Sequence, residues 1–354
     1  MSHPWQRGTD DRRKFDALMT VLVTGGAGFV GSHLSEALVA RGERVIILDD
    51  LSTGSVNNIR NLRSHPQVEC YFESMMERSL LCELVDEADV VYHLAAAVGV
   101  RRIIESPVRT IETNVKGTEL VLDCASKKKK ALFIASTSEV YGKNGHAAFR
   151  EEDDVVLGAS SRSRWSYATS KLLDEFLALA YCKERNVPVV IGRLFNTVGP
   201  RQTGRYGMVL PTFVRQALDG DPITVFGSGR QTRCFGYVGD VVQAIIQLMS
   251  CPAAVGEVVN IGNDSEISIE GLADLIRERT HSVSQIQRIP YDEAYAPGFE
   301  DMQRRVPNVD KLVRLIGFRP TTPLLEIVDL VIAHMKNESK KHCVSTSPLI
   351  ASVA

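Results

Sequence analysis

The sequence predicts an α/β fold: a doubly wound parallel sheet with a smaller α+β lobe. Over the first half of the chain, short apolar runs rich in β-branched residues alternate with amphipathic helical stretches. This alternation is typical of βαβ units, which build a parallel sheet with helices on both faces. After about residue 195, glycine and proline become frequent and the apolar runs shorten, which indicates a second lobe.

The individual strands and helices can be placed in chain order. Buried strands are expected where apolar runs are stopped by glycine or polar residues, at 20–25, 45–49, 90–96, 131–137 and 187–193. Helices are expected where apolar residues recur three and four positions apart, at 33–41, 79–86, 113–126 and 168–185.

The same patterns set the predicted domain boundaries. Residues 19–195 form the first domain, to which the chain returns near 235–262, and residues 196–335 form mainly the second lobe. Residues 1–18 are polar and are predicted to be a disordered leader. Residues 336–354 lack periodicity and are predicted to be a mobile tail.

The composition excludes several classes of protein. The 41 Lys and Arg residues against 43 Asp and Glu leave a net charge of −2, so no positive field exists to hold nucleic acid or an anionic membrane. The longest uncharged apolar stretch, at 94–100, is far shorter than the roughly 20 residues that span a bilayer. No cluster of side chains has metal-ligand spacing, so no metal is expected.

The seven cysteines are widely scattered and contain no C-x-x-C pair. They predict neither a disulfide framework nor a zinc site, and Cys124 and Cys182 are expected to be buried, inert thiols. Free thiols are typical of a reducing compartment, so a cytoplasmic protein is expected.

Three glycines between the first predicted strand and helix have the spacing of a phosphate-binding loop. Gly25, Gly28 and Gly31 read G-x-x-G-x-x-G. The first glycine permits a tight turn, the second lets backbone N–H groups approach a pyrophosphate, and the third lets helix and strand pack closely. The helix N-terminus then faces the anion. The sequence therefore predicts a Rossmann-type dinucleotide-binding domain over 19–195.

An acidic residue at the end of the second strand selects the dinucleotide. Asp49 closes the run VIILD, and a carboxylate there hydrogen-bonds a ribose 2′-hydroxyl and repels a 2′-phosphate. No arginine immediately follows it, so NAD is favoured over NADP. Asp50 is the alternative candidate for this role.

A tyrosine and a lysine four residues apart predict an acid/base centre. Tyr167 and Lys171 share one face of a predicted helix. An ammonium beside a phenol lowers the pKa of the phenol, so this pair is expected to supply a base for a sugar hydroxyl. The strand at 131–137 ends in Thr137, Ser138 and Glu139, at the sheet edge where ligands bind.

With these residues in place, the chain resembles an extended short-chain dehydrogenase/reductase that acts on nucleotide sugars. The resemblance covers about residues 19–335 and rests on motifs in family order: TGGAGFVG, HLAA, STSEVYG, Y-x-x-x-K, RLFNTVGPR and FGYVGD. It implies NAD as the cofactor, a nucleotide sugar, most simply a UDP-sugar, as the substrate, and a homodimer formed through the helices at 113–126 and 168–185.

The resemblance also implies roles for individual residues. Thr137, Tyr167 and Lys171 would be the catalytic hydroxyl, the acid/base and its partner. Further cofactor-binding residues would be Phe29, Val30, Leu94 and Ala95. The substrate-binding residues would be Asn196 and Arg233 at the diphosphate, Phe226 at the uracil, and Arg305.

Two residues bear on the reaction. Glu139 directly follows the strand-end hydroxyls, as in dehydratases and UDP-glucuronate decarboxylases, whereas the simple 4-epimerases that resemble this chain usually lack an acid there. Arg305 begins an Arg-x-Pro segment that resembles one in UDP-glucuronate decarboxylases, where the matching arginine serves the substrate carboxylate. Arg304 and Arg305 could equally be surface charges.

These features favour a UDP-glucuronate decarboxylase, a carboxy-lyase that works through a 4-keto intermediate. A UDP-sugar 4-epimerase, which is an isomerase acting on UDP-glucose or UDP-glucuronate, stays open, and so does a 4,6-dehydratase. From another class, a catalytically silent NAD-binding scaffold on the same fold also stays open.

Three other polar residues near the motifs are expected to be structural. His93 ends a buried strand and is expected to be a core histidine. Asn114 begins a helical stretch and is expected to be a structural hydrogen-bonding residue. Asp240 precedes an apolar helical run and is expected to be its N-cap.

Overall fold

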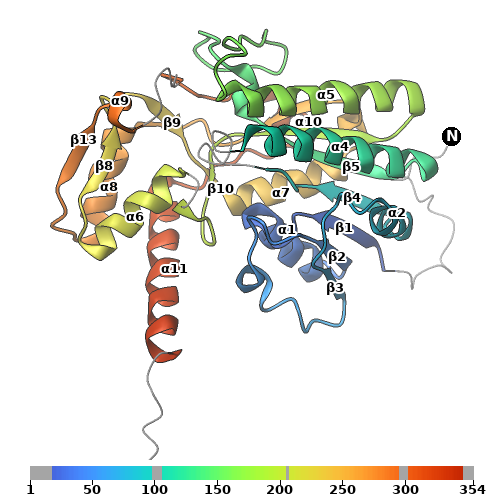
Figure 1. Cartoon of the computed structure of the whole chain (residues 1–354), viewed down its shortest axis with the longest axis horizontal. Coiled ribbons are helices and arrows are strands. Elements are labelled where there is room, and N and C mark those ends of the chain that lie inside the picture. Colours follow the sequence, from blue (N-terminus) through green and yellow to red (C-terminus); the bar gives the residue numbers. More distant parts are fainter. Residues whose placement is uncertain (1–17, 98–105, 205–206, 295–301, 346–354) are drawn as a thin grey trace, which may run out of the picture.

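The computed structural model describes residues 18–97, 106–204, 207–294 and 302–345. Its centre is a seven-stranded parallel sheet in the order β11-β6-β5-β4-β1-β2-β3 (Figure 1). The strands are β1 (Thr20–Thr24), β2 (Arg44–Leu48), β3 (Val68–Tyr71), β4 (Val90–His93), β5 (Ala131–Thr137), β6 (Val189–Leu194) and β11 (Val258–Ile261). The predicted α/β class and parallel sheet are confirmed, and the predicted leader lies outside the described residues except for Leu18.

Helices cover both faces of the sheet because alternate strand residues point to opposite faces and both sets are apolar. Val21 and Val23 of β1 pack on one face, and Leu22 packs on the other. The first face is covered by α1 (Phe29–Ala40), α7 (Val238–Met249) and α10 (Asp310–Ile316). The second is covered by α2 (Arg78–Glu87), α4 (Pro107–Lys128) and α5 (Trp165–Arg185).

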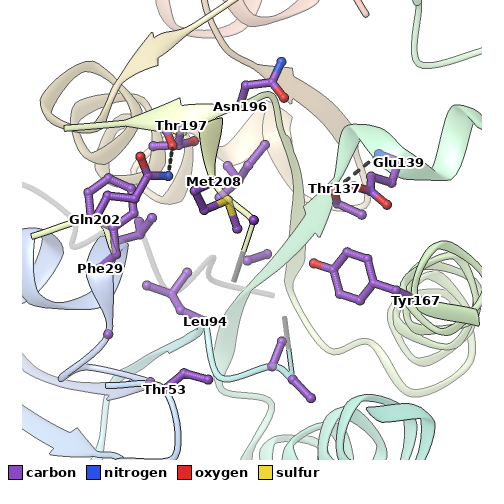
Figure 2. A pocket seen from close by; sticks show the side chains of 18 of the residues that line it. Phe29, Thr53, Leu94, Thr137, Glu139, Tyr167, Asn196, Thr197, Gln202 and Met208 are labelled. Atoms are coloured by element: carbon purple, nitrogen blue, oxygen red, sulfur yellow. Dashed lines mark hydrogen bonds between the residues drawn. The ribbon is translucent and has the colours of Figure 1, made fainter. Parts of the chain in front are cut away.

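The strand order reverses between β1 and β4, which are neighbours in the sheet and separated by β2 and β3 in sequence. In a doubly wound sheet this reversal opens a crevice outside the carboxyl ends of the strands. The large cavity of the molecule lies there, and Figure 2 shows the side chains of its wall.

The second lobe has its own apolar core and lies beside the first domain in Figure 1. Its helices are α6 (Val209–Asp219), α8 (Ile269–Thr280), α9 (Tyr291–Ala294) and α11 (Leu324–Ser345). Its strands are β8 (Ile223–Phe226) with β13 (Ile286–Ile289), and β9 (Thr232–Cys234) with β12 (Glu266–Ser268). β7 (Thr197–Val198) pairs in parallel with β10 (Gly236–Tyr237). This short ladder links the segment by which the chain leaves the first domain to the segment by which it returns. Three short 3-10 turns, η1 (Val56–Ile59), η2 (Ser138–Tyr141) and η4 (Pro252–Ala254), complete the elements used below.

A mobile tail was predicted over 336–354, and its first ten residues, 336–345, are helical, which their lack of periodicity did not indicate. Helix α11 continues through Ser345, and residues 346–354 lie outside the described residues. Its first half buries Ile327, Val331 and Met335 in the core of the second lobe. Because helix propagation is easier than nucleation, the anchored first turns carry the polar second half with them. Figure 1 shows α11 running away from the rest of the fold.

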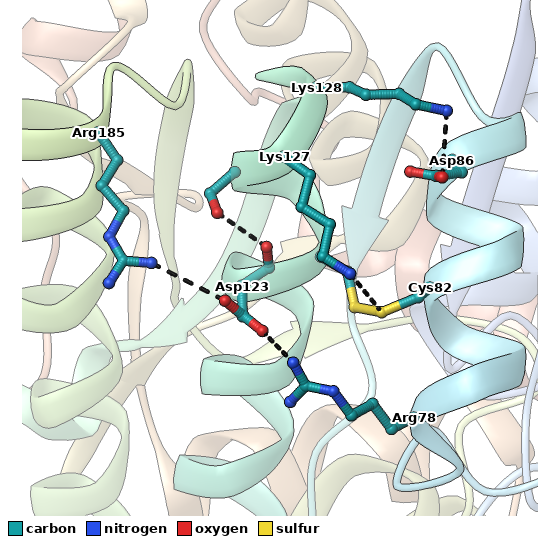
Figure 3. Close-up of a disulfide and its surroundings, with 9 residues drawn as sticks. Arg78, Cys82, Asp86, Asp123, Lys127, Lys128 and Arg185 are labelled. Carbon is teal, nitrogen blue, oxygen red and sulfur yellow. Dashed lines mark hydrogen bonds and ion pairs between the residues drawn. A yellow bond between two sulfur atoms is a disulfide. The ribbon is translucent and has the colours of Figure 1, made fainter.

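The prediction that the cysteines form no disulfide, with Cys124 as an inert thiol, was also wrong. Cys82 of α2 and Cys124 of α4 are bonded, although 42 positions separate them in sequence (Figure 3). The two helices pack side by side on one face of the sheet, which brings the two sulfur atoms together. The argument for a reducing compartment from unpaired cysteines therefore loses its basis.

We expect the Cys82–Cys124 bond to stabilise the fold measurably. Closing a loop of this length removes conformational entropy from the unfolded chain, which is worth about 2 to 4 kcal/mol. Cys82→Ser should lower the free energy of unfolding by that amount in a urea titration without reductant. Cys70→Ser is the control, because Cys70 is a partly buried free cysteine. Cys124 is buried, so alkylation is read after unfolding without reductant. Equal stability of wild type and Cys82→Ser, with both cysteines of the unfolded wild type alkylated, would contradict the bond.

Candidate active site

A cavity of about 1100 Å³ runs between the carboxyl edge of the sheet and the second lobe. Both parts of the chain contribute to its wall. Of the predicted site residues, those that line it are Gly25, Gly28, Phe29, Val30, Gly31, Asp49, Leu94, Ala95, Thr137, Ser138, Glu139, Tyr167, Asn196, Phe226, Arg233 and Arg305. Lys171 does not line it.

The glycine loop has the close contacts that its sequence predicts. Gly25 has a φ of +73°, and a Cβ there would lie 2.8 Å from the backbone nitrogen of Ala95. A Cβ on Gly31 would overlap the carbonyl oxygen of Gly25, so helix and loop touch without a side chain between them. Gly28 is the N-cap of α1, which places the positive end of that helix at the cavity wall. The loop therefore fits a pyrophosphate.

Asp49 organises the loop at the end of β2. Its carboxylate accepts hydrogen bonds from the backbone N–H of Ala27 at 2.9 Å and of Leu51 at 2.8 Å. Burial raises the pKa of Asp49, and these two hydrogen bonds oppose that rise. Asp50 also lines the cavity but is exposed, and it accepts a hydrogen bond from the Ser52 N–H. The buried, oriented carboxylate of Asp49 fits the ribose-binding role.

We expect Asp49→Asn to weaken NAD binding by about 10- to 100-fold. A hydrogen bond to a charged group contributes roughly 1.5 to 3 kcal/mol, and the amide also loses the repulsion that discriminates against a 2′-phosphate. Equilibrium titrations with NAD and NADP measure both effects. Asp50→Asn is the matched control and should bind NAD as the wild type does. The reverse ranking of the two variants would assign the ribose contact to Asp50.

Tyr167 projects from α5 into the cavity, opposite Thr137 and Glu139 (Figure 2). Burial raises the pKa of its phenol, and the carboxylates of Glu139 and Asp174 raise it further. Hydrogen bonding with Thr137 and the charge of Arg305 act in the opposite direction. The cavity therefore favours a protonated tyrosine.

The predicted lowering of the Tyr167 pKa by Lys171 was wrong for this structure. The Lys171 ammonium lies 2.8 Å from the carboxylate of Asp174, and both side chains are almost fully buried. The four-residue spacing places Tyr167 and Lys171 on one helix face, as predicted. However, the acid one turn further along α5 binds the ammonium away from the cavity.

The strand-end hydroxyls and Glu139 are positioned by the 3-10 turn η2. Thr137 caps this turn, and its hydroxyl oxygen accepts a hydrogen bond from the Glu139 N–H at 3.2 Å. Ser138 is buried at the cavity wall, and its hydroxyl has no hydrogen-bond partner among the described residues. A buried hydroxyl of this kind fits a site that a ligand completes.

Arg305 is a buried cation in the cavity wall. Its guanidinium lies 3.7 Å from the Glu139 carboxylate and donates a hydrogen bond to the Asn196 side-chain oxygen at 3.4 Å. Its segment is held against the first domain by the bridge between Phe149 and Pro307. Arg304, the preceding residue, is instead largely exposed and paired with Glu266 at 2.7 Å. The sequence did not distinguish Arg304 from Arg305. In the structure Arg305 is buried in the cavity wall and Arg304 is exposed to solvent.

The second lobe provides the far wall of the cavity. Arg233 lies on β9, where it donates a hydrogen bond to the Thr232 carbonyl at 2.7 Å. Phe226 ends β8, and its carbonyl accepts a hydrogen bond from the Gln231 side chain at 2.9 Å. The Asn196 side chain donates a hydrogen bond to the Cys234 carbonyl at 2.9 Å, which holds the segment after β6 against β9. These contacts orient the three residues that were predicted to bind the nucleotide diphosphate and base.

Sequence reasoning missed several residues of the cavity wall. They come from helix starts and crossover loops and include Arg109, Thr113, Arg164, Thr197, Gln202, Met208, Phe213 and Tyr291. Arg164 could have been found from the sequence, because it lies three residues before Tyr167 and so shares its helix face. Thr197 follows Asn196 within the motif RLFNTVGPR and could also have been found. The others belong to no motif and become neighbours only when the second lobe packs over the sheet.

Two of the three predicted structural polar residues are confirmed. His93 is within hydrogen-bonding distance of the hydroxyls of Thr24 at 2.8 Å and Thr118 at 3.2 Å, and burial lowers its pKa to about 3. Asn114 accepts a hydrogen bond from the Ala97 N–H at 2.7 Å.

The predicted capping role of Asp240 was wrong. Asp240 lies inside the first turn of α7, where Tyr237 is the N-cap. Its carboxylate accepts hydrogen bonds from the Thr322 hydroxyl at 2.9 Å and backbone N–H at 3.0 Å. The helix begins earlier than predicted because Val238 and Gly239 already adopt helical geometry. Asp240 therefore ties α7 to the chain that leads into α11.

Within the described ranges, no helix is long and apolar enough to cross a membrane. No group of three His, Cys, Asp or Glu side chains is arranged to hold a metal ion in the same part of the chain.

Comparisons with known proteins agree with this geometry. Residues 22–331 match the family model described as GDP-mannose 4,6 dehydratase. The chain is 45% identical over 300 residues to a UDP-N-acetyl-α-D-glucosaminuronate decarboxylase of Bacillus cytotoxicus, covering 84% of this chain and 92% of the relative. It is 36% identical to UDP-glucuronic acid decarboxylase 1 of Xenopus tropicalis, covering 90% of this chain and 72% of the relative.

A solved structure shares the whole architecture. It is the UDP-glucuronic acid 4-epimerase of Bacillus cereus in complex with UDP-glucuronic acid and NAD, with a TM-score of 0.82 and 28% identity. The match covers 90% of this chain and 100% of that chain. The chain therefore belongs to the GDP-mannose 4,6-dehydratase-like family of extended short-chain dehydrogenases/reductases.

Proposed function

We propose that the protein is an NAD-dependent decarboxylase of a UDP-hexuronate. The observation that carries the proposal is the placement of Arg305, which lies buried in the cavity wall beside Glu139 and near Tyr167. A substrate carboxylate can approach this guanidinium more closely than the Glu139 carboxylate, which lies 3.7 Å away, and it matches the geometry of the guanidinium. The names of the Bacillus and Xenopus relatives support the same reaction class, on UDP-N-acetylglucosaminuronate and UDP-glucuronate respectively.

NAD is the cofactor, and the glycine loop and Asp49 would hold it. When bound, NAD accepts a hydride from C4 of the sugar and later returns it, and the charge on its oxidised nicotinamide ring favours the phenolate of Tyr167. Tyr167 takes the proton of the C4 hydroxyl, and Thr137 hydrogen-bonds the same oxygen. The product of this step is a β-keto acid, because C5 carries the carboxylate.

Loss of CO₂ from the β-keto acid breaks the C5–C6 bond and leaves an enolate over C4 and C5. The hydroxyls of Tyr167 and Thr137 donate hydrogen bonds to the enolate oxygen. Arg305 orients the departing carboxylate. Glu139 relays a proton from solvent to C5. Tyr167 then returns its proton to the C4 oxygen as the hydride comes back to C4, which gives a UDP-pentose with no net oxidation.

A proton NMR time course tests the proposal. The enzyme is incubated with catalytic NAD and either UDP-glucuronate or its 2-acetamido counterpart, and the anomeric signals and released CO₂ are recorded. A UDP-pentose with stoichiometric CO₂ is expected. A UDP-galacturonate signal without CO₂ would instead identify a 4-epimerase, the reaction named for the Bacillus cereus neighbour. Absence of turnover with both uronates and with UDP-glucose would favour a silent NAD-binding protein.

We also propose that the protein is a homodimer and acts in the cytoplasm. Helices α4 and α5 lie side by side and expose large apolar side chains to solvent, namely Val108, Ile111, Leu173 and Phe176. A second copy of the same face would bury them, and light scattering would give twice the monomer mass. In the reducing cytoplasm the Cys82–Cys124 bond would be open, so both thiols should be alkylated when cells are lysed directly into denaturant with a thiol-blocking reagent. In the purified, air-oxidised protein the bond should protect them.

A further inference from the structure

The ion pair between Lys171 and Asp174 lies on α5 in the two turns that follow the acid/base tyrosine. The Lys171 Nζ is 2.8 Å from the Asp174 Oδ2, and the two side chains are 3% and 0% exposed. Tyr167, Lys171 and Asp174 follow one another at four and three residues along α5, so they occupy successive turns of one helix face. The pair therefore lies within electrostatic range of the phenol while staying outside the cavity.

The groups around the pair are mostly uncharged. Burial raises the pKa of Asp174, and Lys171 and the Thr118 hydroxyl of α4 oppose that rise. Asn114, also from α4, donates to the Ser170 hydroxyl at 3.1 Å. From β4, His93 faces Thr118 and is neutral, because burial lowers its pKa to about 3.

Charges also face the phenol and the pair from the other sides. On the cavity side, Glu139 from η2 and Arg305 from the segment after α9 face Tyr167. Glu175, the neighbour of Asp174 on α5, is paired with Arg193 of β6 at 2.7 Å. The charge on the helix side of Tyr167 is thus set mainly by Lys171 and Asp174.

A buried ion pair is a poor source of stability. Removing two charges from water costs several kcal/mol, and apolar residues of similar volume often serve the fold as well or better. A pair at this position has another consequence, because its two charges act in opposite senses on a neighbouring phenol. The Asp174 carboxylate raises the pKa of Tyr167, and an unpaired Lys171 ammonium would lower it.

We propose that Asp174 is a positioning residue, which holds the Lys171 ammonium away from Tyr167 and offsets its charge there. The inference rests on the proposed function only in taking Tyr167 as the acid/base. Asp174 thereby changes the effect of Lys171 on the pKa of Tyr167, and this pKa sets the pH range in which the enzyme works.

The test is a titration of Tyr167 in the NAD-saturated enzyme without substrate. Tyrosine is labelled with ¹³C at Cζ, and the signal missing in Tyr167→Phe identifies the residue. In Asp174→Asn, which keeps the shape and removes the charge, the titration midpoint should fall by roughly one to three pH units. The acid limb of the kcat profile should move to lower pH in the same variant.

Glu175→Gln is the matched control. Glu175 is also buried, ion-paired and next to Asp174, but it is not one of the groups with the largest effects on the pKa of Tyr167. This variant should lower thermal stability and leave the Tyr167 midpoint unchanged. If Asp174→Asn likewise lowers stability and leaves the midpoint unchanged, Asp174 is structural and the inference is wrong.

Lys171→Met/Asp174→Asn keeps the test readable if the single variant does not fold. It removes both buried charges, so no unpaired charge is left inside α5. Its midpoint should lie at or slightly below that of the wild type, because the two charges oppose each other at the phenol. A midpoint clearly above that of the wild type would mean that Lys171 acts on the phenol without being offset, and would overturn the inference. A shifted midpoint in an enzyme that releases no CO₂ would support the role of Asp174 while refuting the decarboxylase.

Discussion

Replacing Tyr167 with phenylalanine should lower kcat by about 10²- to 10⁴-fold, the range for loss of a positioned acid/base. The phenol points into the cavity opposite Thr137 and Glu139, where it can take the proton of the sugar hydroxyl (Figure 2). Phenylalanine fills the same volume, so NAD affinity and thermal stability should change little. Single-turnover formation of reduced cofactor, followed by absorbance, isolates the first proton and hydride transfer.

The pH dependence follows from the direction of the Tyr167 pKa. Burial and two nearby carboxylates raise it, so at neutral pH most of the free enzyme carries a protonated phenol. The wild-type rate should therefore increase as pH rises, and this acid limb should disappear in Tyr167→Phe. Tyr181→Phe, on the same helix, is the control and should behave as the wild type. Full activity of Tyr167→Phe at any pH would remove the tyrosine from the mechanism.

Replacing Arg305 with methionine should cost about 2 to 5 kcal/mol in kcat/KM for a UDP-hexuronate, or roughly 30- to 5,000-fold. This is the range for truncating one partner of a buried, hydrogen-bonded charge pair. Arg305 lies 3.7 Å from Glu139 and contacts Asn196, so its loss also leaves the Glu139 carboxylate without that cation. Steady-state rates of CO₂ release measure the effect.

Arg304→Met is the matched control, because it removes the same charge one position away. Arg304 is exposed and pairs with Glu266, and exposed pairs contribute about 0 to 1 kcal/mol. A binding titration separates the roles further: Arg305→Met should lose affinity for UDP-glucuronate while keeping its affinity for UDP-glucose, whose sugar carries no carboxylate. Equal losses for the two ligands would mean that Arg305 supports the cavity wall and does not recognise the carboxylate.

Most of the cavity-wall residues that were predicted could be recognised from local sequence patterns at the ends of strands. A glycine-bounded apolar run followed by a helical pattern has few structural solutions, and parallel strands end at one edge of the sheet. Gly25, Asp49, Thr137 and Tyr167 could be assigned to a common site for this reason, although they span more than a hundred residues of sequence.

Contacts between residues that belong to no local sequence pattern could not be predicted, because they depend on how the elements pack. The sequence left Arg304 and Arg305 equivalent, and the bridge at Pro307 turns one into the cavity and the other into solvent. Cys82 and Cys124 meet because α2 packs on α4, and nothing in their spacing indicates it.

The amino-acid sequence by itself determined the α/β fold, the glycine loop with the acidic residue that follows the second strand, and the placement of the tyrosine at the sheet edge. These features depend on backbone conformation and on side-chain periodicity, which are local properties. Only the tertiary structure decided that Lys171 pairs with Asp174, that Arg305 is buried beside Glu139, and that the polar end of α11 is helical. Those outcomes depend on which buried charges and apolar faces find partners, and such partners come from anywhere in the folded chain.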